Sequence, residues 1–319
     1  MTTFKEIRGT AVKSLSSDPS NPETGQLWYN NSIGVLKGYR LVASAWASGG
    51  NLGTARYNLA GAGIQTAGLG FGGFTTVNVA DTEEYDGSTW TGGGNLGTAR
   101  RVLGGAGTQN AALAFGGFTT AAVNNTEEYD GSAWTGGGNL GTARRGLAGC
   151  GTQTAGLGFG GVGPLTATEE YDGSAWSAGG NLSTARRNLA GAGTQIEALA
   201  FGGRDATAAT GTTEEYDGSA WTAGGNLGTA RYFLAGAGLQ TAGLGFGGYT
   251  TANSNATEEY NGTSWTASTA MTTARYGLAG AGTQTAGLAF GGFTTAVTAA
   301  TEEYSGAALA TKTITTSTS

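Results

Sequence analysis

The sequence predicts an all-β fold, a six-bladed β-propeller of four-stranded blades with a small N-terminal β-hairpin extension. Three observations predict it. The stretch Thr-Glu-Glu-Tyr-Asp-Gly-Ser-Thr-Trp at 82–90 recurs with small edits to the end of the chain. A second motif, Thr-Ala-Arg, places its Arg at 56, 100, 144, 186, 231 and 275, so the copies lie roughly 44 residues apart. Each copy contains four short strand-like segments, and repeated four-stranded units of this length are typical of propellers.

The composition limits the possible functions. Of 319 residues, 62 are Gly, none is His and 12% are charged, with a net charge of −6. A nucleic-acid binder would show a basic face, so a nucleic-acid partner is not expected. Without His the chain lacks the commonest general base and the commonest transition-metal ligand. We therefore expect no metal and no other cofactor.

Targeting signals are also missing. The N-terminus has no apolar run or cleavage pattern, so no signal peptide is expected. No stretch approaches the roughly 18 apolar residues of a membrane span. These features predict a protein made in a cytoplasm, without membrane insertion. The single cysteine, Cys150, stands where five other copies have Ala, so a small, buried and inert thiol is expected.

The chain divides into three segments in sequence. Residues 1–43 form an attachment segment with a β-hairpin over 25–39, residues 44–309 the propeller, and residues 310–319 a C-terminal tail. The last copy has Leu309 where the others have Trp, and an extra Trp46 precedes the first copy. This mismatch predicts that residues 43–49 supply the fourth strand of the last blade. The alternative is that residues 307–316 make that strand themselves.

In the first copy we expect strands at residues 57–63, 68–73, 82–85 and 88–91. The Asp86-Gly87 pair predicts a two-residue hairpin turn. That turn would pair Tyr85 with Ser88 and Glu83 with Trp90, and would place Glu84 on the opposite face. The first strand is nearly all Ala and Gly, which suits a crowded position near a symmetry axis. The repeated Arg and the first Glu of each pair are expected to be structural ion pairs, because a buried charge needs a partner.

The order of motifs resembles the kelch repeat over about residues 44–306. A Gly-Gly doublet closes the second strand, Tyr and Trp follow, and an Arg opens the next first strand. The copies are shorter than typical kelch repeats and richer in Gly, Ala and Thr. The resemblance implies kelch-like blades. Because Glu-Glu occurs in every copy, it indicates a repeated structural need rather than a catalytic dyad, and we expect no enzymatic activity.

Function is expected where the copies differ. The loops between second and third strands vary most, and they share a face with the loops that join successive blades. Aromatic and Arg side chains, which commonly anchor binding surfaces, follow the Gly-Gly doublet and the Thr-Ala-Arg motif there. The alternative is that they only pack over loop backbone. The candidate binding residues are Phe74, Phe118, Arg204, Tyr249, Phe293, Tyr57, Arg101, Arg145, Arg187, Tyr232 and Tyr276.

The N-terminal segment resembles the start of tail-associated and fibre-like proteins of marine bacteriophages. The resemblance lies in residues 4–10, 17–30 and 36–39. It implies a non-enzymatic virion protein that joins other virion proteins through residues 1–43 and displays a propeller to a host-surface glycan or protein. The sequence does not decide whether the chain forms a homo-oligomer. The alternatives are a cellular kelch-like interaction module and a propeller enzyme acting on glycans.

Overall fold

All regular elements that the structure describes are β-strands. The computed structural model describes residues 12–163 and 165–314, with 28 strands in seven four-stranded sheets. The chain forms two compact units, Ala45–Ser305 and a smaller one made of Met1–Ser44 with Gly306–Ser319. Over the described residues, no helix is long and apolar enough to cross a membrane. The fold is therefore all-β and repetitive, as a β-propeller requires.

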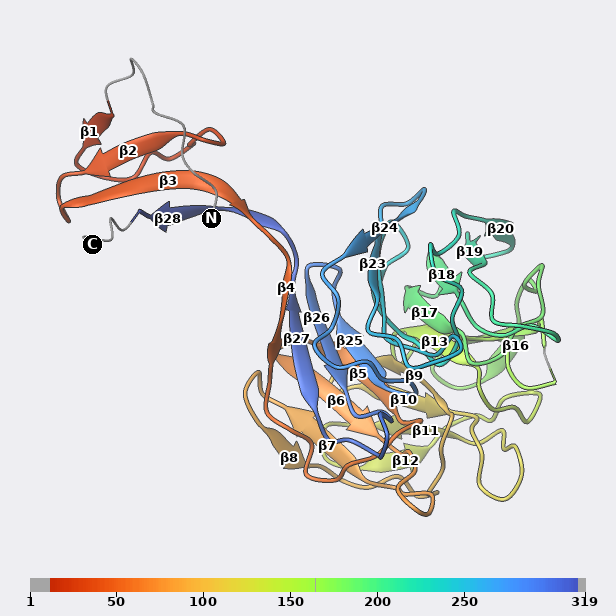
Figure 1. The fold of residues 1–319 in the computed structure, drawn as a ribbon. Helices are drawn as coiled ribbons and strands as arrows, with labels where there is room; N and C mark the ends of the chain where they lie inside the picture. The colour runs from red at the N-terminus through yellow and green to blue at the C-terminus, as the bar shows by residue number, and fades with distance from the viewer. Residues whose placement is uncertain (1–11, 164, 315–319) are drawn as a thin grey trace. The chain divides into compact units, whose positions relative to one another are not determined.

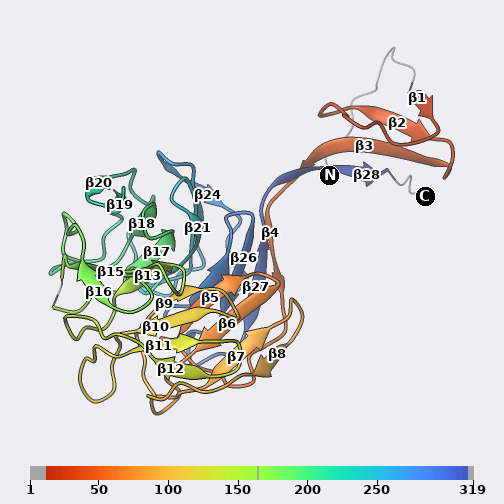
Figure 2. The same cartoon turned by 180° about the vertical axis from the view of Figure 1, so that it is seen from behind.

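The large unit contains six antiparallel sheets, each numbered here from its first to its fourth strand. In Figures 1 and 2 the first strands lie toward the centre of this group and the labelled fourth strands lie at its outside. The first strands are β5 (Ala60–Ile64), β9 (Gly104–Gly107), β13 (Ala148–Gly151), β17 (Ala190–Gly193), β21 (Ala235–Leu239) and β25 (Ala279–Gly282). The second strands are β6 (Ala67–Phe71), β10 (Ala112–Phe115), β14 (Gly156–Phe159), β18 (Ala198–Phe201), β22 (Ala242–Phe246) and β26 (Ala286–Phe290). The third strands are β7 (Thr82–Tyr85), β11 (Thr126–Tyr129), β15 (Thr168–Tyr171), β19 (Thr213–Tyr216), β23 (Thr257–Tyr260) and β27 (Thr301–Ser305). The fourth strands are β8 (Trp90–Gly92), β12 (Trp134–Gly136), β16 (Trp176–Ala178), β20 (Trp221–Ala223), β24 (Trp265–Ser268) and β4 (Ala45–Ser48).

The last sheet takes its fourth strand from the beginning of the unit. β4 pairs antiparallel with β27, and Trp46 lies opposite Tyr304. This is the pairing that the missing Trp of the last copy predicted. The segment carrying Leu309 does not make that strand, since β28 (Ala308–Thr313) pairs with β3 (Val35–Val42) instead.

The small unit is one mixed sheet in the order β1-β2-β3-β28. β2 (Leu27–Asn30) and β3 form the expected hairpin, and β1 (Lys13–Leu15) runs parallel to β2. Its polar centre is Asp18, which accepts hydrogen bonds from Lys37 (2.6 Å), Asn30 (2.8 Å) and Trp28 (3.0 Å). The bond from Lys37 is the main reason that the pKa of Asp18 falls to about 2. Through β28, residues 308–313 thus belong to the same sheet as the N-terminal hairpin.

The six sheets of the large unit contact one another through their first strands. β5 contacts β9, and the contacts continue through β13, β17, β21 and β25, which contacts β5 in turn. A Cβ at Gly61 of β5 would lie 2.7 Å from the carbonyl oxygen of Gly280 in β25. Such close approach explains why these strands are built of Ala and Gly.

The outer hairpin differs in register from the prediction. Tyr85 lies opposite Trp90, and Glu83 opposite Gly92, so the predicted pairs Tyr85–Ser88 and Glu83–Trp90 are wrong. The cause is Asp86, whose Oδ1 accepts hydrogen bonds from the backbone N–H groups of Ser88 and Thr89 at 2.8 and 2.7 Å. This side-chain turn lengthens the connection to four residues. Because the register shifts by two, Glu83, Tyr85 and Trp90 still share one face.

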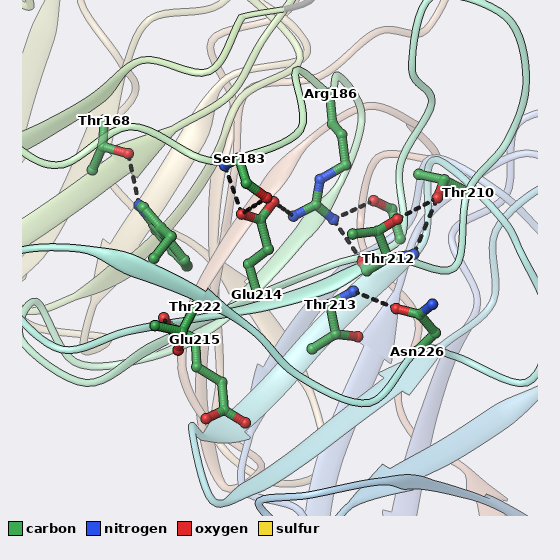
Figure 3. Close-up of polar contacts among 12 residues, drawn as sticks. Thr168, Ser183, Arg186, Thr210, Thr212, Thr213, Glu214, Glu215, Thr222 and Asn226 are labelled. Carbon is green, nitrogen blue, oxygen red and sulfur yellow. Dashed lines mark hydrogen bonds and ion pairs between the residues drawn. The ribbon is translucent and has the colours of Figure 1, made fainter.

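A buried ion pair occurs in every copy, as predicted. The Arg of Thr-Ala-Arg is fully or almost fully buried and lies within 3.2 Å of the first Glu of the Glu-Glu pair. Figure 3 shows the copy in which both side chains are fully buried, Arg186 with Glu214. The six pairs are Arg56–Glu83, Arg100–Glu127, Arg144–Glu169, Arg186–Glu214, Arg231–Glu258 and Arg275–Glu302.

The second Glu of each pair links neighbouring sheets. Tyr129 of one sheet donates its hydroxyl to Glu84 of the preceding sheet at 2.6 Å, and Tyr85 of the first sheet donates to Glu303 of the last, also at 2.6 Å. Trp134 Nε1 likewise donates to Thr82 Oγ1 of the preceding sheet at 2.9 Å. The motif that recurs in the sequence thus adds a second set of contacts between neighbouring sheets, besides those of the first strands.

Candidate functional site

Six equivalent residues form a ring of backbone hydrogen bonds in the large unit. Each lies two residues after the Arg of Thr-Ala-Arg, and each N–H donates to the carbonyl oxygen of the equivalent residue one copy earlier, at 2.6 to 2.9 Å. The first residue donates to the last, so the series returns to its start. The ring consists of Asn58, Val102, Gly146, Asn188, Phe233 and Gly277.

All six ring residues have positive φ, between 52° and 64°. Glycine and asparagine tolerate this left-handed conformation, but Val102 (φ 52°) and Phe233 (φ 54°) do not adopt it without strain. The side chain of Asn188 occupies the space that a Cβ on Gly146 would need. Asn58 Oδ1 is buried without a hydrogen-bond partner among the described residues. Large and polar side chains are therefore held at positions where the backbone alone would favour glycine.

A cavity of about 420 Å³ lies beside this ring. Ring residues form part of its wall, and the rest comes from the residues that follow Thr-Ala-Arg in copies two to four and Gly-Gly in copies two and three. None of its lining residues is a carboxylate, a cysteine or a lysine. The lining residues are Asn58, Arg101, Val102, Phe118, Arg145, Val162, Arg187, Asn188 and Phe233.

Two of the cavity arginines, Arg101 and Arg145, lie over aromatic rings. The guanidinium carbon of Arg101 is 4.2 Å from the ring centre of Phe74 and 5.1 Å from that of Phe118. Arg145 lies 4.2 Å from the Phe118 ring. In the part of the chain that the structure describes, no carboxylate lies within 4.0 Å of these guanidinium groups or of those of Arg187 and Arg204. The cavity thus carries positive charge that no neighbouring Asp or Glu compensates directly.

Aromatic side chains form a continuous cluster in copies five, six and one. Tyr276 is central to it, with ring centres of Tyr249 and Phe293 at 5.5 Å and of Phe233 at 5.9 Å. Burial raises the pKa of the Tyr276 hydroxyl, and the neighbouring tyrosines add to the effect. Tyr57 extends the cluster, 5.4 Å from Phe293. Through Phe233 the cluster reaches the wall of the cavity.

The structure brings the sequence-predicted site residues together in pairs. Isolated β-bridges join Tyr57 to Phe74, Arg101 to Phe118, Arg187 to Arg204, Tyr232 to Tyr249 and Tyr276 to Phe293. Arg145 accepts a backbone hydrogen bond from Val162 at 2.7 Å. Four of the eleven candidates line the cavity directly: Arg101, Phe118, Arg145 and Arg187. The other seven occupy equivalent or bridged positions in the loops around it.

Sequence reasoning missed the ring residues that line the cavity. Asn58, Val102, Asn188 and Phe233 follow the candidate positions by one residue. A signal was available, because this is the position that changes most inside the otherwise uniform block from Thr-Ala-Arg to Leu. When one residue varies inside an otherwise uniform motif of an array, the scaffold does not require a particular side chain at that position.

The site offers hydrogen-bond donors, positive charge and aromatic surface. Among residues 12–163 and 165–314, no group of three or more Cys, Asp or Glu side chains is placed to hold a metal ion. Cys150 is buried, and burial raises the pKa of its thiol. The chain matches no protein-family model and no curated protein.

Proposed function

We propose that this chain is a non-enzymatic binding protein whose propeller loops bind a host-surface glycan or protein. The observation that carries the proposal is the cavity of about 420 Å³, which is lined by three arginines without a carboxylate partner among the described residues, two of them stacked on aromatic rings. Concave sites with a few convergent polar groups are the usual form of ligand sites. The lining residues supply donors and apolar surface and include no ordinary general acid or base.

The proposed scaffold is a six-bladed, kelch-like propeller. Three observations support six blades and a closed ring: the first strands contact one another in a cycle, Tyr85 donates to Glu303, and β4 completes the last sheet. The ring of backbone hydrogen bonds through the six equivalent residues supports the same conclusion. The motif order, with Gly-Gly, Tyr, Trp and Arg at repeated positions, supports the kelch-like assignment.

We further propose that the protein is part of a bacteriophage virion, in the tail or its fibres. The support is the sequence of the N-terminal segment, whose residues 17–30 and 36–39 belong to the small unit. Residues 4–10 of the same resemblance lie outside the described residues. In this proposal residues 1–43 bind other virion proteins and the propeller remains available to the host.

Particle association and cell binding test the two parts separately. Mass spectrometry of purified particles should detect the chain, and its absence would contradict the virion proposal. The purified chain should bind host cells, and the binding should be lost in Phe118→Ala and Tyr249→Ala. Ile196→Ala is the matched control, because Ile196 is 61% exposed and lies in the turn joining β17 to β18. Equal cell binding by all three variants would refute the assignment of the loop face, and turnover of a bacterial polysaccharide would refute the non-enzymatic role.

A further inference from the structure

We infer that the ligand of the cavity beside the backbone ring is an acidic glycan. Its carboxylate or sulfate would bind the arginines, and its sugar rings would lie against the aromatic cluster. The inference rests on the proposed binding role of the loop face and names the class of ligand.

The first step is charge. The chain supplies a Glu for each of its six buried scaffold arginines, at 2.8 to 3.2 Å. Arg101, Arg145 and Arg187 line one cavity and have no such partner among the described residues. Clustered cations in a concave site repel one another and concentrate anions. In a chain with a net charge of −6, this local positive charge favours an anionic ligand.

The second step is orientation. Stacking on Phe74 and Phe118 at 4.2 Å holds the guanidinium groups of Arg101 and Arg145 in place. Among the described residues, one hydrogen bond engages the Arg101 side chain, from Nη1 to Asn78 Oδ1 at 3.3 Å. A guanidinium carries five N–H donors in a planar fork. Arginines fixed in this way are suited to bidentate binding of a carboxylate or sulfate.

A further arginine lies in the same loops. The Arg204 guanidinium lies 5.6 Å from the ring centre of Tyr232, at the border between the arginines and the aromatic cluster. Positive charge and an aromatic ring thus adjoin at this border.

The third step is the distribution of arginine and tyrosine over the loop face. The residue after Thr-Ala-Arg is Arg in copies two, three and four, and Tyr in copies five, six and one. Consecutive copies contact one another, so the arginines form one contiguous half and the tyrosines the other. Tyrosine combines a flat apolar ring with a hydroxyl that hydrogen-bonds. A sugar presents apolar C–H faces and hydroxyl edges, which match that half.

The fourth step is size. A cavity of about 420 Å³ is within the range of small-ligand sites. A stable protein interface needs about 800 Å² on each partner, which a cavity of this kind does not supply. A nucleic acid requires an extended basic groove, whereas the arginines here are confined to three consecutive copies. An acidic oligosaccharide fits the charge, the aromatic surface and the volume together.

Calorimetric titration of the full chain with trigalacturonate and with its methyl ester tests the inference. The two probes share chain length and ring chemistry, and each carboxylate of the acid is an uncharged methyl ester in the second probe. We expect the acid to bind and its affinity to fall as salt is added, and the ester to bind about tenfold or more weakly. Dextran sulfate and dextran form a second pair, and selective binding of either charged probe supports the inference. Which of the two charged probes binds distinguishes a carboxylate ligand from a sulfate ligand.

Arg145→Gln and Arg187→Gln should each weaken binding of the acid about tenfold, and Arg145→Lys should restore part of it, because Lys keeps the charge but not the planar fork. Arg40→Gln in the small unit removes the same charge from an exposed side chain and should leave binding unchanged. Equal binding of charged and neutral probes would overturn the inference while leaving the proposed function intact. So would preferential binding of an oligonucleotide, or host-cell binding with no affinity for either charged probe.

Discussion

Glu214→Gln removes the charge from the most deeply buried ion pair of the scaffold. Glu214 Oε1 lies 2.8 Å from Arg186 Nη2, and neither side chain is exposed. Glu214 Oε2 accepts hydrogen bonds from the backbone N–H and the hydroxyl of Ser183, at 2.7 and 2.6 Å (Figure 3). Gln keeps the shape of Glu, but it leaves Arg186 without a compensating charge and turns an N–H₂ group toward a donor.

The expected loss follows from the contacts that remain. Breaking a buried pair by removing one partner costs about 3–5 kcal/mol. Arg186 still donates to the carbonyl oxygens of Gly202 and Thr212, at 2.9 and 2.6 Å. Because these two bonds remain, we expect the free energy of unfolding to fall by about 3 kcal/mol, the lower end of that range. For a unit of this size, this corresponds to a fall in melting temperature on the order of 10 °C.

Denaturant unfolding followed by tryptophan fluorescence measures the effect. Asp217→Asn in the same sheet is the matched control, because the fifth copy already carries Asn261 at that place in the turn. The double variant Arg186→Met/Glu214→Leu should recover most of the lost stability, since an apolar pair removes both buried charges. A loss of less than about 1 kcal/mol in Glu214→Gln would refute the view that these pairs hold the scaffold.

Three further predictions concern the ring, the sheet contacts and the thiol. Raising the pH from 10 to 12 should unfold the large unit cooperatively, because burial and then the hydrogen bond to Glu303 raise the pKa of Tyr85 from 10.0 to about 12. The protonated tyrosine is favoured in the fold, so its contribution is complete below pH 10 and is lost toward pH 12; tyrosinate absorbance that rises without loss of circular dichroism would contradict this. Val102→Gly should raise the free energy of unfolding by about 1 kcal/mol, because Gly adopts its φ of 52° without strain, and a loss of stability on denaturation would contradict the strain. Cys150 should react with a thiol reagent only at the rate of unfolding, since burial raises its pKa; rapid labelling of the native chain would contradict its burial.

The sequence by itself determined the features that repeat locally. Strand positions, the Arg56–Glu83 type of pair and the exchange of β4 into the last sheet followed from motif order and from one missing Trp. These features could be predicted because each depends on a short block that recurs six times. The loop residues of the candidate face were chosen because variation in an array indicates release from the structural repeat, and their role in binding stays a prediction.

Only the tertiary structure decided how those parts meet. The outer hairpin is shifted by two residues because the Asp86 side chain binds the backbone of its own turn, a contact that the Asp-Gly pair did not specify. The pairing of β28 with β3 joins residues near the two ends of the chain, for which no local pattern exists. The backbone ring and the cavity beside it bring together single residues from six copies, and their left-handed φ follows from hydrogen bonds between copies. Long-range contacts of this kind are set by packing, so only the fold brings Arg101, Arg145 and Arg187 to the wall of one cavity.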